Sequence, residues 1–502
     1  MSTSITQNDI SSETIQRTQQ YSNWQNIIFW SAVVALIVIA IGMRLYHLGV
    51  PFDRDGYDEG VYWQTLRSMS AGNMLYKQIF YSQPPLFILS TFPGYVLFGS
   101  SLWSARFGIA LVSLLGLLGA FLLGKALSGR LGAIAAILLL VVNPLYLAQS
   151  QTLEAEVSST ALSLLAIGLA YLWWEHPDGT RGFFYAALTG ITISLSILCK
   201  LLSISVLVPI VLLMLARLWQ IWNKQPGMRL TYLLPIVAGV TTCLITFIVF
   251  LLPFSGSYQA MLQEVISFHS TAAQVYSSSQ QANIAIIQNA LTSLLTITAL
   301  FGMVAALLRR DWRVVPLLAW FFATLYLLWH QVPLFPHHLI ALTPPLIALA
   351  VIGIGKQSLQ SREVSTDVIS KASPYLTWVA ILLILITTIL NVQQDRLYYR
   401  TAVATSEAAF TQLESKVAID LRLATTPKQL VVTDAQFIAG LADRSTPPAL
   451  VDTSAVRITS NALTLSQLEN ATSQPQVHAV LFFTGRFYLS NVARYHAWVA
   501  QH

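Results

Sequence analysis

Acidic and aromatic side chains crowd into one short stretch that follows the first long apolar run. The stretch reads Asp53-Arg54-Asp55-Gly56-Tyr57-Asp58-Glu59-Gly60-Val61-Tyr62-Trp63. Only 10% of the 502 residues are charged, and carboxylates placed beside apolar segments are costly and usually functional. We expect Asp58 to be a catalytic base. Capping of a helix that begins near Tyr57 or Asp58 explains the acids equally well.

Two further carboxylates and one lysine could complete such a site. Glu154 and Glu156 lie between two apolar runs and are two residues apart, so on a helix we expect only one to face inward. A second carboxylate there could bind acceptor hydroxyls or a divalent cation, or it could cap the next helix. Lys200 interrupts an apolar run, so it either extends to the membrane interface or meets an anion such as phosphate.

A pair of adjacent histidines could supply further ligands to this site, and a double proline could set the direction of a neighbouring segment. His337 and His338 follow Pro336 in a proline-rich segment, where an irregular backbone could aim an imidazole at a metal or phosphate; a place at the membrane interface is an alternative. We include His269 with Glu154 and Glu156 as candidate ligands for Mg, Mn, Ca or Zn. Gln83 precedes two prolines, which fix an extended entry to the next segment.

The composition places these groups in a membrane protein. The hydrophobic fraction is 55%, the mean hydropathy is +0.61 and there are 13 tryptophans, which excludes an ordinary soluble domain. The formal net charge is +6, but the basic residues lie in connectors between apolar runs, so we expect no nucleic-acid partner. Cys199 and Cys243 lie within or at the end of apolar runs and indicate no disulfide framework.

About eleven apolar runs have the length of a membrane span. They cover residues 26–48, 103–127, 131–149, 157–174, 183–199, 201–222, 230–252, 284–308, 312–330, 338–355 and 374–391. The polar residues 1–25 predict a disordered cytoplasmic tail. Residues 26–395 therefore predict a polytopic α-helical transmembrane catalytic domain, with residues 49–102 as an outer catalytic loop.

The run from Pro85 to Phe98 decides the topology. It is short and contains Pro93 and Gly94, which is typical of a juxtamembrane or re-entrant segment. If it does not cross, and the N-terminus is cytoplasmic, nearly all basic connectors lie inside, as the positive-inside rule requires. The outer face of the cell membrane then gathers Asp58, both glutamates, Lys200 and the histidines.

Residues 396–502 predict a small soluble α/β domain. Residues 430–433, 449–452 and 477–483 have strand patterns, and they alternate with helical patterns over 435–442, 463–470 and 488–500. This alternation favours a mainly parallel sheet, and an odd number of crossings places the domain outside. Asp434 and Asp452 follow strands and could bind a ligand, although turns and caps are the commoner use of such acids.

Taken in order, these features resemble the integral-membrane GT-C glycosyltransferases of the protein O-mannosyltransferase and aminoarabinose transferase type (glycosyltransferase family 39-like). The resemblance covers roughly residues 26–355, and its most specific part is an Asp-Glu loop followed by a double proline. It rests on Asp58-Glu59, Pro84-Pro85-Leu86, Leu97-Phe98-Gly99, Ala105-Arg106, Glu156, Lys200 and the segment from His337-His338 to Pro344-Pro345.

The resemblance implies transfer of a sugar from a polyprenyl-phosphate donor to a hydroxyl of a glycan, lipid or protein acceptor at the outer face of the membrane. It implies inversion at the anomeric carbon, with Asp58 as general base and Glu59 beside it in the catalytic pair. The chemistry agrees, because an attacking hydroxyl needs a proton acceptor. A leaving phosphate also needs fixed positive charge or a metal.

Two positions depart from the resembled pattern. Gln83 and Val61 stand where aminoarabinose transferases have a lysine and an arginine, so other groups must bind the phosphate. The candidate substrate-binding residues are Glu156, Lys200, Arg106, Tyr57, Gln83, His337 and His338, with Arg54 as a further cation.

A transporter, or a scaffold of lipid-linked glycan metabolism, is the alternative. Transporters tend to have repeated halves and charges near the bilayer midplane. This chain shows no internal repeat, and its acids lie at the ends of apolar runs. A carboxylate-lined cavity at one end of the helices would favour the enzyme.

Overall fold

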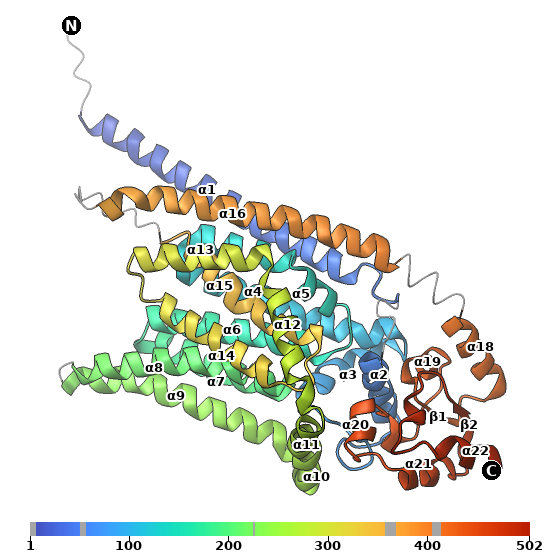
Figure 1. The fold of residues 1–502 in the computed structure, drawn as a ribbon. Coiled ribbons are helices and arrows are strands. Elements are labelled where there is room, and N and C mark those ends of the chain that lie inside the picture. The colour runs from blue at the N-terminus through green and yellow to red at the C-terminus, as the bar shows by residue number, and fades with distance from the viewer. Residues whose placement is uncertain (1–6, 51–56, 224–225, 357–367, 404–412) are drawn as a thin grey trace.

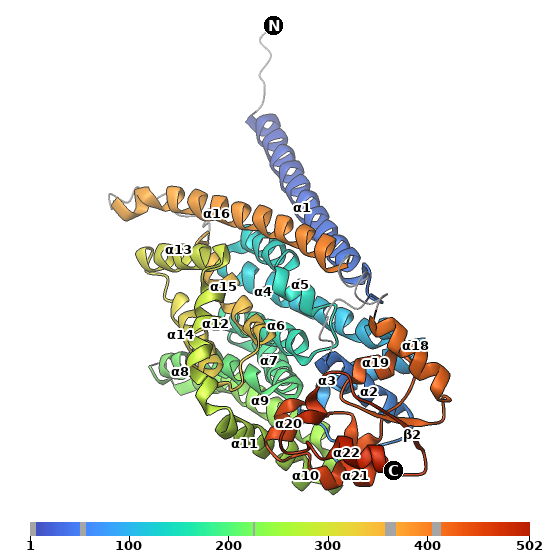
Figure 2. The same ribbon diagram turned by 45° about the vertical axis from the view of Figure 1, so that its right-hand side comes forward.

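The structure is a computed structural model that describes residues 7–50, 57–223, 226–356, 368–403 and 413–502. Long helices lie side by side in one bundle, and a small domain packs against one end of it (Figure 1, Figure 2). The bundle helices are α1 (Gln7–Leu45), α4 (Leu102–Val141), α6 (Ala155–Glu175), α7 (Gly179–Cys199), α8 (Leu207–Trp222), α9 (Pro226–Leu251), α13 (Leu294–Leu308), α14 (Val314–His330), α15 (Thr343–Ile352) and α16 (Val368–Tyr398). Shorter elements join them: α2 (Tyr57–Ser70), α3 (Leu86–Phe98), α5 (Pro144–Gln149), η1 (Leu201–Val206), η2 (Leu252–Ser257), α10 (Tyr258–Leu262), η3 (Gln263–Ser267), α11 (Phe268–Val275), η4 (Ser277–Ser279), α12 (Gln280–Leu291), η5 (Pro336–Leu342) and η6 (Tyr399–Val403).

The element α4 is a tight hairpin of two helices. Its backbone leaves the helical region at Ser128 and Gly129, where Gly129 has φ of 66°. A Cβ atom placed on Gly124 would lie 2.8 Å from Cβ of Ala136, although twelve residues of straight helix span about 18 Å. The two predicted runs 103–127 and 131–149 are therefore antiparallel neighbours, and the second ends at Val141 before α5 begins.

The helix α6 forms the centre of the bundle. All of its residues from Ala155 to Trp173 are buried. A Cβ atom on Gly119 of α4 would come within 2.4 Å of the Leu165 nitrogen of α6, so only glycine allows the two backbones to lie this close. The first turn of α6 is thereby fixed at one end of the bundle, and this turn carries Glu156.

The span count differs from the predicted eleven. Within the described residues, seven helices are long and apolar enough to cross a membrane, or eight if one bent pair is a single span. That pair is α12 and α13, which meet at 76° where we expected one straight run over residues 284–308. The helices α14 and η5–α15 are apolar but shorter. The expected disordered tail also differs, because residues 7–25 belong to α1; residues 1–6 lie outside the described part.

Several connectors meet at one end of the bundle, which we call the α2 end. Gln151 Nε2 donates to the Met43 carbonyl oxygen, 2.9 Å away, and Tyr399 donates to Gln151 Oε1 over 2.8 Å. Arg106, in the first turns of α4, donates to the Leu48 carbonyl over 3.0 Å. The chain therefore leaves α1 and enters α4 at the same end, so α3 begins and ends without a crossing.

Basic residues gather at the opposite end. Lys356, just after α15, pairs with Glu175 at the end of α6. Arg313, before α14, pairs with Asp311 at 2.6 Å and donates to the Ala126 carbonyl at the α4 turn. The connectors at this end therefore carry basic side chains, two of which are paired with acidic side chains.

The C-terminal domain has fewer strands than expected. Its described residues form one parallel two-stranded sheet, β1 (Leu430–Thr433) with β2 (Val477–Leu481). The predicted strand over 449–452 is wrong, because η8 (Pro448–Leu450) and a turn stand there. The helices are α18 (Ser415–Ala424), α19 (Gln436–Leu441), α20 (Ala455–Thr459), α21 (Leu465–Thr472), η9 (Arg486–Tyr488) and α22 (Tyr495–Gln501).

The C-terminal domain docks on α2 through glycine-lined contacts. A Cβ atom on Gly60 would lie 2.4 Å from the Phe437 nitrogen, and one on Gly440 would lie 2.6 Å from the Trp63 ring. Gln64 of α2 donates to the Arg444 carbonyl over 3.0 Å, and its Oε1 accepts from a backbone N–H of the domain. In Figure 1 and Figure 2 the domain, drawn in red, lies beside α2.

A candidate active site at the α2 end

A cavity of about 840 Å³ lies at the α2 end, between the helix bundle and the C-terminal domain. Loops from distant parts of the chain form its wall. Of the residues singled out from the sequence, it is lined by Tyr57, Asp58, Gln83, Glu154, Glu156, Lys200, His269, His337 and His338. The structure therefore brings together in one place groups that are up to 281 residues apart in the sequence.

Asp58 and Glu59 have different environments although they are adjacent. Successive residues of a helix point about 100° apart, and only Asp58 lines the cavity. Glu59 turns into the protein and binds Arg106 through two contacts of 2.6 Å, Nε with Oε1 and Nη2 with Oε2. Both side chains of this pair are fully buried, and Glu59 also accepts from the Leu153 N–H over 2.9 Å.

The expected catalytic role of Glu59 and the expected phosphate-binding role of Arg106 therefore do not fit their positions. Their bidentate contact joins α2 to α4 and to the segment before α6, away from the cavity. Arg54, the further cation considered, lies outside the described residues.

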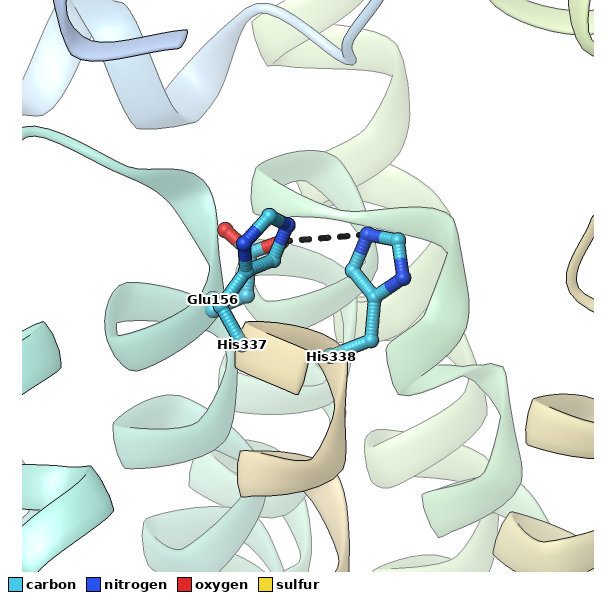
Figure 3. Close-up of side chains that lie close together, drawn as sticks. All are labelled: Glu156, His337 and His338. Carbon is cyan, nitrogen blue, oxygen red and sulfur yellow. Dashed lines mark ion pairs between the residues drawn. The ribbon is translucent and has the colours of Figure 1, made fainter. Parts of the chain in front are cut away.

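Glu156 is surrounded by three basic side chains. Its carboxylate pairs with Lys200, which ends α7 in an extended conformation. His338 Nε2 lies 3.5 Å from Glu156 Oε1, and His337 Nε2 lies 3.6 Å from the same oxygen. Figure 3 shows both imidazoles, carried by η5, facing the carboxylate on α6. The sequence left two alternatives for Lys200, extension to the membrane interface or contact with an anion such as phosphate, and in this structure the neighbouring anion is the Glu156 carboxylate.

His337 stands between two carboxylate groups. Its Nδ1 lies 3.9 Å from Glu154 Oε2, on the side opposite to Glu156. Ligand atoms of Asp58, Glu154 and His337 lie within 4.8 Å of one another, as do those of Glu156, His337 and His338. Both Glu154 and Glu156 thus face the cavity, whereas we expected only one of them to do so.

These two groups fit a divalent cation in donor type and spacing. Two ligands of a tetrahedral zinc, each about 2.1 Å from the metal, are about 3.4 Å apart, which is close to the separations around His337. The donor set of imidazole and carboxylate suits Zn or Mn. The expected ligand His269 is in neither group: it lines the cavity, but its Nε2 lies 2.8 Å from the Ser82 carbonyl oxygen.

Tyrosines of α2 form a second wall. Burial, followed by the charge of Asp452, raises the pKa of Tyr57 well above its usual value, although Arg486 opposes the shift. Burial and then Asp58 raise the pKa of Tyr62. Both phenols therefore remain protonated hydrogen-bond donors. Tyr62 also packs edge-on against Phe87 of α3, with ring centres 4.9 Å apart.

The C-terminal domain contributes residues that the sequence did not single out for this site. Asp452, Ser454, Val456 and Arg486 line the cavity. Tyr57 donates to Asp452 Oδ1 over 3.0 Å, and the Arg486 guanidinium lies 3.7 Å from the centre of the Tyr57 ring. The position of Asp452 after an expected strand was a weak signal. Arg486 carried none, because only folding brings residues that lie 395 and 429 positions downstream of Tyr57 to this wall.

Comparison with known proteins connects the site to one class of enzyme. Residues 82–252 match the family described as dolichyl-phosphate-mannose-protein mannosyltransferase. No curated protein sequence matches the chain. The family match begins at the loop before α3 and includes α4, Glu154, Glu156 and Lys200.

Solved structures share the fold over nearly the whole chain. ArnT from Cupriavidus metallidurans bound to undecaprenyl phosphate is 16% identical, with a TM-score of 0.59 over 91% of this chain and 90% of that one. The same protein in the apo state is 15% identical, with a TM-score of 0.53 over 85% and 86%. The Archaeoglobus fulgidus oligosaccharyltransferase is more distant, at 15% identity and a TM-score of 0.49 over 91% and 69%.

These findings confirm the predicted resemblance and the polytopic helical fold class. The fold comparison covers the helix bundle and extends beyond the segment matched by the family. The chain is thus a polytopic helical membrane protein with the fold of the GT-C glycosyltransferases, and the mannosyltransferase family match supports the same enzyme class.

Proposed function

We propose that the protein transfers a sugar, with inversion, from a polyprenyl-phosphate donor to an acceptor hydroxyl at the outer face of the membrane. The observation that carries this proposal is the convergence of Asp58, Glu154, Glu156, Lys200 and His337 on one cavity at the α2 end. The cavity lies where apolar helices end, so a lipid-linked donor reaches it from the bilayer with its phosphate at the polar edge.

In the proposed step, the acceptor oxygen attacks the anomeric carbon and the bond from that carbon to the phosphate oxygen breaks. The electron pair of the broken bond leaves with the phosphate. Asp58 takes the hydroxyl proton, since it is the cavity acid on the first turn of α2 and a base must lie within hydrogen-bond reach of the attacking oxygen. The acceptor can be a glycan, lipid or protein.

Lys200 is the proposed partner of the leaving phosphate. Its ammonium is paired with Glu156, so donor binding exchanges a carboxylate for a phosphate as its anionic partner, and the Glu156 carboxylate keeps the neighbouring imidazoles of His337 and His338. The imidazoles of His337 and His338 lie beside the same carboxylate and can donate to phosphate oxygens. Gln83 supplies a neutral amide to the cavity.

Orientation follows from charge. Arg130, Arg181, Arg309, Arg313 and Lys356 lie at the end opposite the cavity, and an excess of such residues marks the cytoplasmic side. The cavity and the C-terminal domain are then extracytoplasmic. Support for the donor class comes from ArnT, whose structure is described as bound to undecaprenyl phosphate.

A cation would add Lewis acidity where phosphate charge develops. Glu156, His337 and His338 would bind it in one arrangement, and Asp58, Glu154 and His337 in the other. Only the first arrangement leaves Asp58 available as a base, and it requires Lys200 to leave Glu156.

Metal content tests this part of the proposal. We expect the purified protein to bind about one zinc or manganese per chain by mass spectrometry of the metal, because the donor set matches such ions. His337→Ala removes a ligand from both groups and should abolish binding. His478→Ala, an exposed histidine on β2, should leave the metal content unchanged. Retention of the metal by His337→Ala would exclude both arrangements.

A donor panel tests the reaction itself. Purified protein in lipid nanodiscs is incubated with polyprenyl phosphates that carry different radiolabelled sugars, together with an extract of cell-envelope acceptors. We expect one label to move to an acceptor with inverted anomeric configuration, determined by NMR of the product. Retained configuration, or failure of every lipid-linked donor while a nucleotide sugar is used, would contradict the proposal.

A further inference from the structure

We propose that Asp452, in the C-terminal domain, is a positioning residue for the base: through Tyr57 it fixes the first turn of α2 and with it the carboxylate of Asp58. The inference rests on the proposed function, which makes Asp58 the base. It gives the C-terminal domain a part in the reaction beyond covering the cavity.

The contact between the two domains is made at the residue next to the base. Tyr57 is the first residue of α2 and Asp58 is the second. The Tyr57 hydroxyl donates to Asp452 Oδ1 over 3.0 Å, and the Arg486 guanidinium covers the ring face at 3.7 Å. The ring is thus fixed at its tip and on its face. Since Tyr57 and Asp58 share a peptide unit, movement of one displaces the other.

Asp452 is itself rigidly fixed. Its Oδ1 also accepts from the Ser454 N–H over 2.7 Å. Its carbonyl oxygen accepts from the buried Arg457 guanidinium over 2.5 Å, and that guanidinium lies 3.7 Å from the centre of the Phe80 ring in the loop between α2 and α3. Asp452 therefore belongs to a segment that is anchored on the transmembrane domain at a second point.

The sheet of the C-terminal domain fixes Arg486, the second residue of this domain that contacts Tyr57. Asp434 directly follows β1 and accepts from the Arg486 N–H over 3.0 Å. The Asp434 carbonyl also accepts from Arg486 Nη1 over 3.1 Å. Arg486 lies just after β2, so the paired carboxyl ends of both strands set its position over Tyr57.

The phenol is suited to a donor role in this contact. Its hydroxyl lies 3.0 Å from Asp452 Oδ1, and a hydrogen bond to a carboxylate is stronger than one to a neutral acceptor. Docking of the domain as a whole depends on other contacts, such as those of Gln64 with the Arg444 region.

The test compares Asp452→Ala, Asp452→Asn and Tyr57→Phe in the full chain. We expect kcat to fall about 10- to 100-fold in Asp452→Ala and Tyr57→Phe, while KM for the lipid-linked donor changes less than about twofold, because a misplaced catalytic group costs rate rather than binding. Asp452→Asn retains an oxygen acceptor and should recover much of the rate. The double variant Asp452→Ala/Tyr57→Phe should be no slower than either single one, because both changes remove the same contact.

Hydrogen–deuterium exchange provides a readout that does not depend on activity. In Asp452→Ala, the amides of Val61 and Tyr62, which follow the first turn of α2 and donate to its carbonyls, should exchange faster, while those of α19 and β1 remain as protected as in the unaltered protein. Asp420→Asn and Tyr488→Phe, both exposed on the C-terminal domain, serve as controls and should change neither measurement.

Each outcome decides the inference. Unchanged exchange in α2 overturns it, even if no transferase activity is found for any donor, so its failure is distinct from failure of the proposed function. Increased exchange in α19 and β1 as well as α2 also overturns it, because Asp452 would then stabilise the domain in general. A change in KM with constant kcat would assign Asp452 to substrate binding instead.

Discussion

Asp58→Asn is expected to lower the transfer rate by about 10²- to 10⁴-fold, which is the usual contribution of a positioned general base. Asparagine keeps the shape and helix position of the side chain but cannot accept the hydroxyl proton. Asp58 lines the cavity and lies close to Glu154 and His337, and the substitution alters no other group of the cavity wall. A lower transfer rate would therefore report the loss of this one carboxylate. The measurement is single-turnover transfer from the donor that the panel identifies.

The control for this variant is Asp420→Asn, which makes the same chemical change on the exposed α18 of the C-terminal domain. We expect it to retain full activity. Thermal unfolding of Asp58→Asn, followed by intrinsic fluorescence, should match that of the unaltered protein. Retained turnover in a folded Asp58→Asn protein would remove Asp58 from the role of base.

Arg106→Met is expected to lower the free energy of unfolding by about 3–5 kcal/mol, because it leaves the Glu59 carboxylate buried without its charged partner. The pair is bidentate and both side chains are fully buried. Arg106 also donates to the Leu48 and Val50 carbonyls, over 3.0 and 2.5 Å, so the change loosens the entry to α4 as well. The unfolding temperature, at which half of the folded protein is lost during heating in detergent, should fall and measures this destabilisation.

Two variants separate this structural role from a catalytic one. Arg181→Met, which replaces an exposed arginine of α7, should leave the unfolding temperature unchanged. Glu59→Leu/Arg106→Met should be more stable than Arg106→Met, since it removes the unpaired charge, and it should keep measurable transfer. A Glu59→Gln protein that is fully stable but inactive would instead restore Glu59 to the catalytic pair.

The difference between Asp58 and Glu59 illustrates where sequence reasoning is limited. Both acids lie beside an apolar run, where charged side chains are costly and usually functional, and the sequence therefore indicates a catalytic role for both. The direction of each depends on how α2 is rotated, and this rotation is set by packing against α4 and α19. A pattern within one segment carries no information on that rotation.

The second strand expected over residues 449–452 was wrong for a related reason. A short apolar segment has the same pattern in a strand and in a buried turn. Here two prolines precede it and Arg457 binds the Ala449 and Asp452 carbonyl oxygens over 2.8 and 2.5 Å. These carbonyls are therefore satisfied by a side chain, and the segment supplies Asp452 to the cavity in place of a third strand.

The sequence by itself determined the membrane class, the helical character of the apolar runs and the end of the bundle at which the acids, Lys200 and the histidines meet. It could do so because hydrophobic length and charge placement act locally and are constrained by the bilayer. Only the tertiary structure decided that Asp58 faces the cavity and that Arg106 forms a buried ion pair with Glu59. It also decided that Asp452 and Arg486 complete the cavity wall. Those outcomes depend on contacts between segments hundreds of residues apart, and such contacts are fixed only when helices and domain pack together.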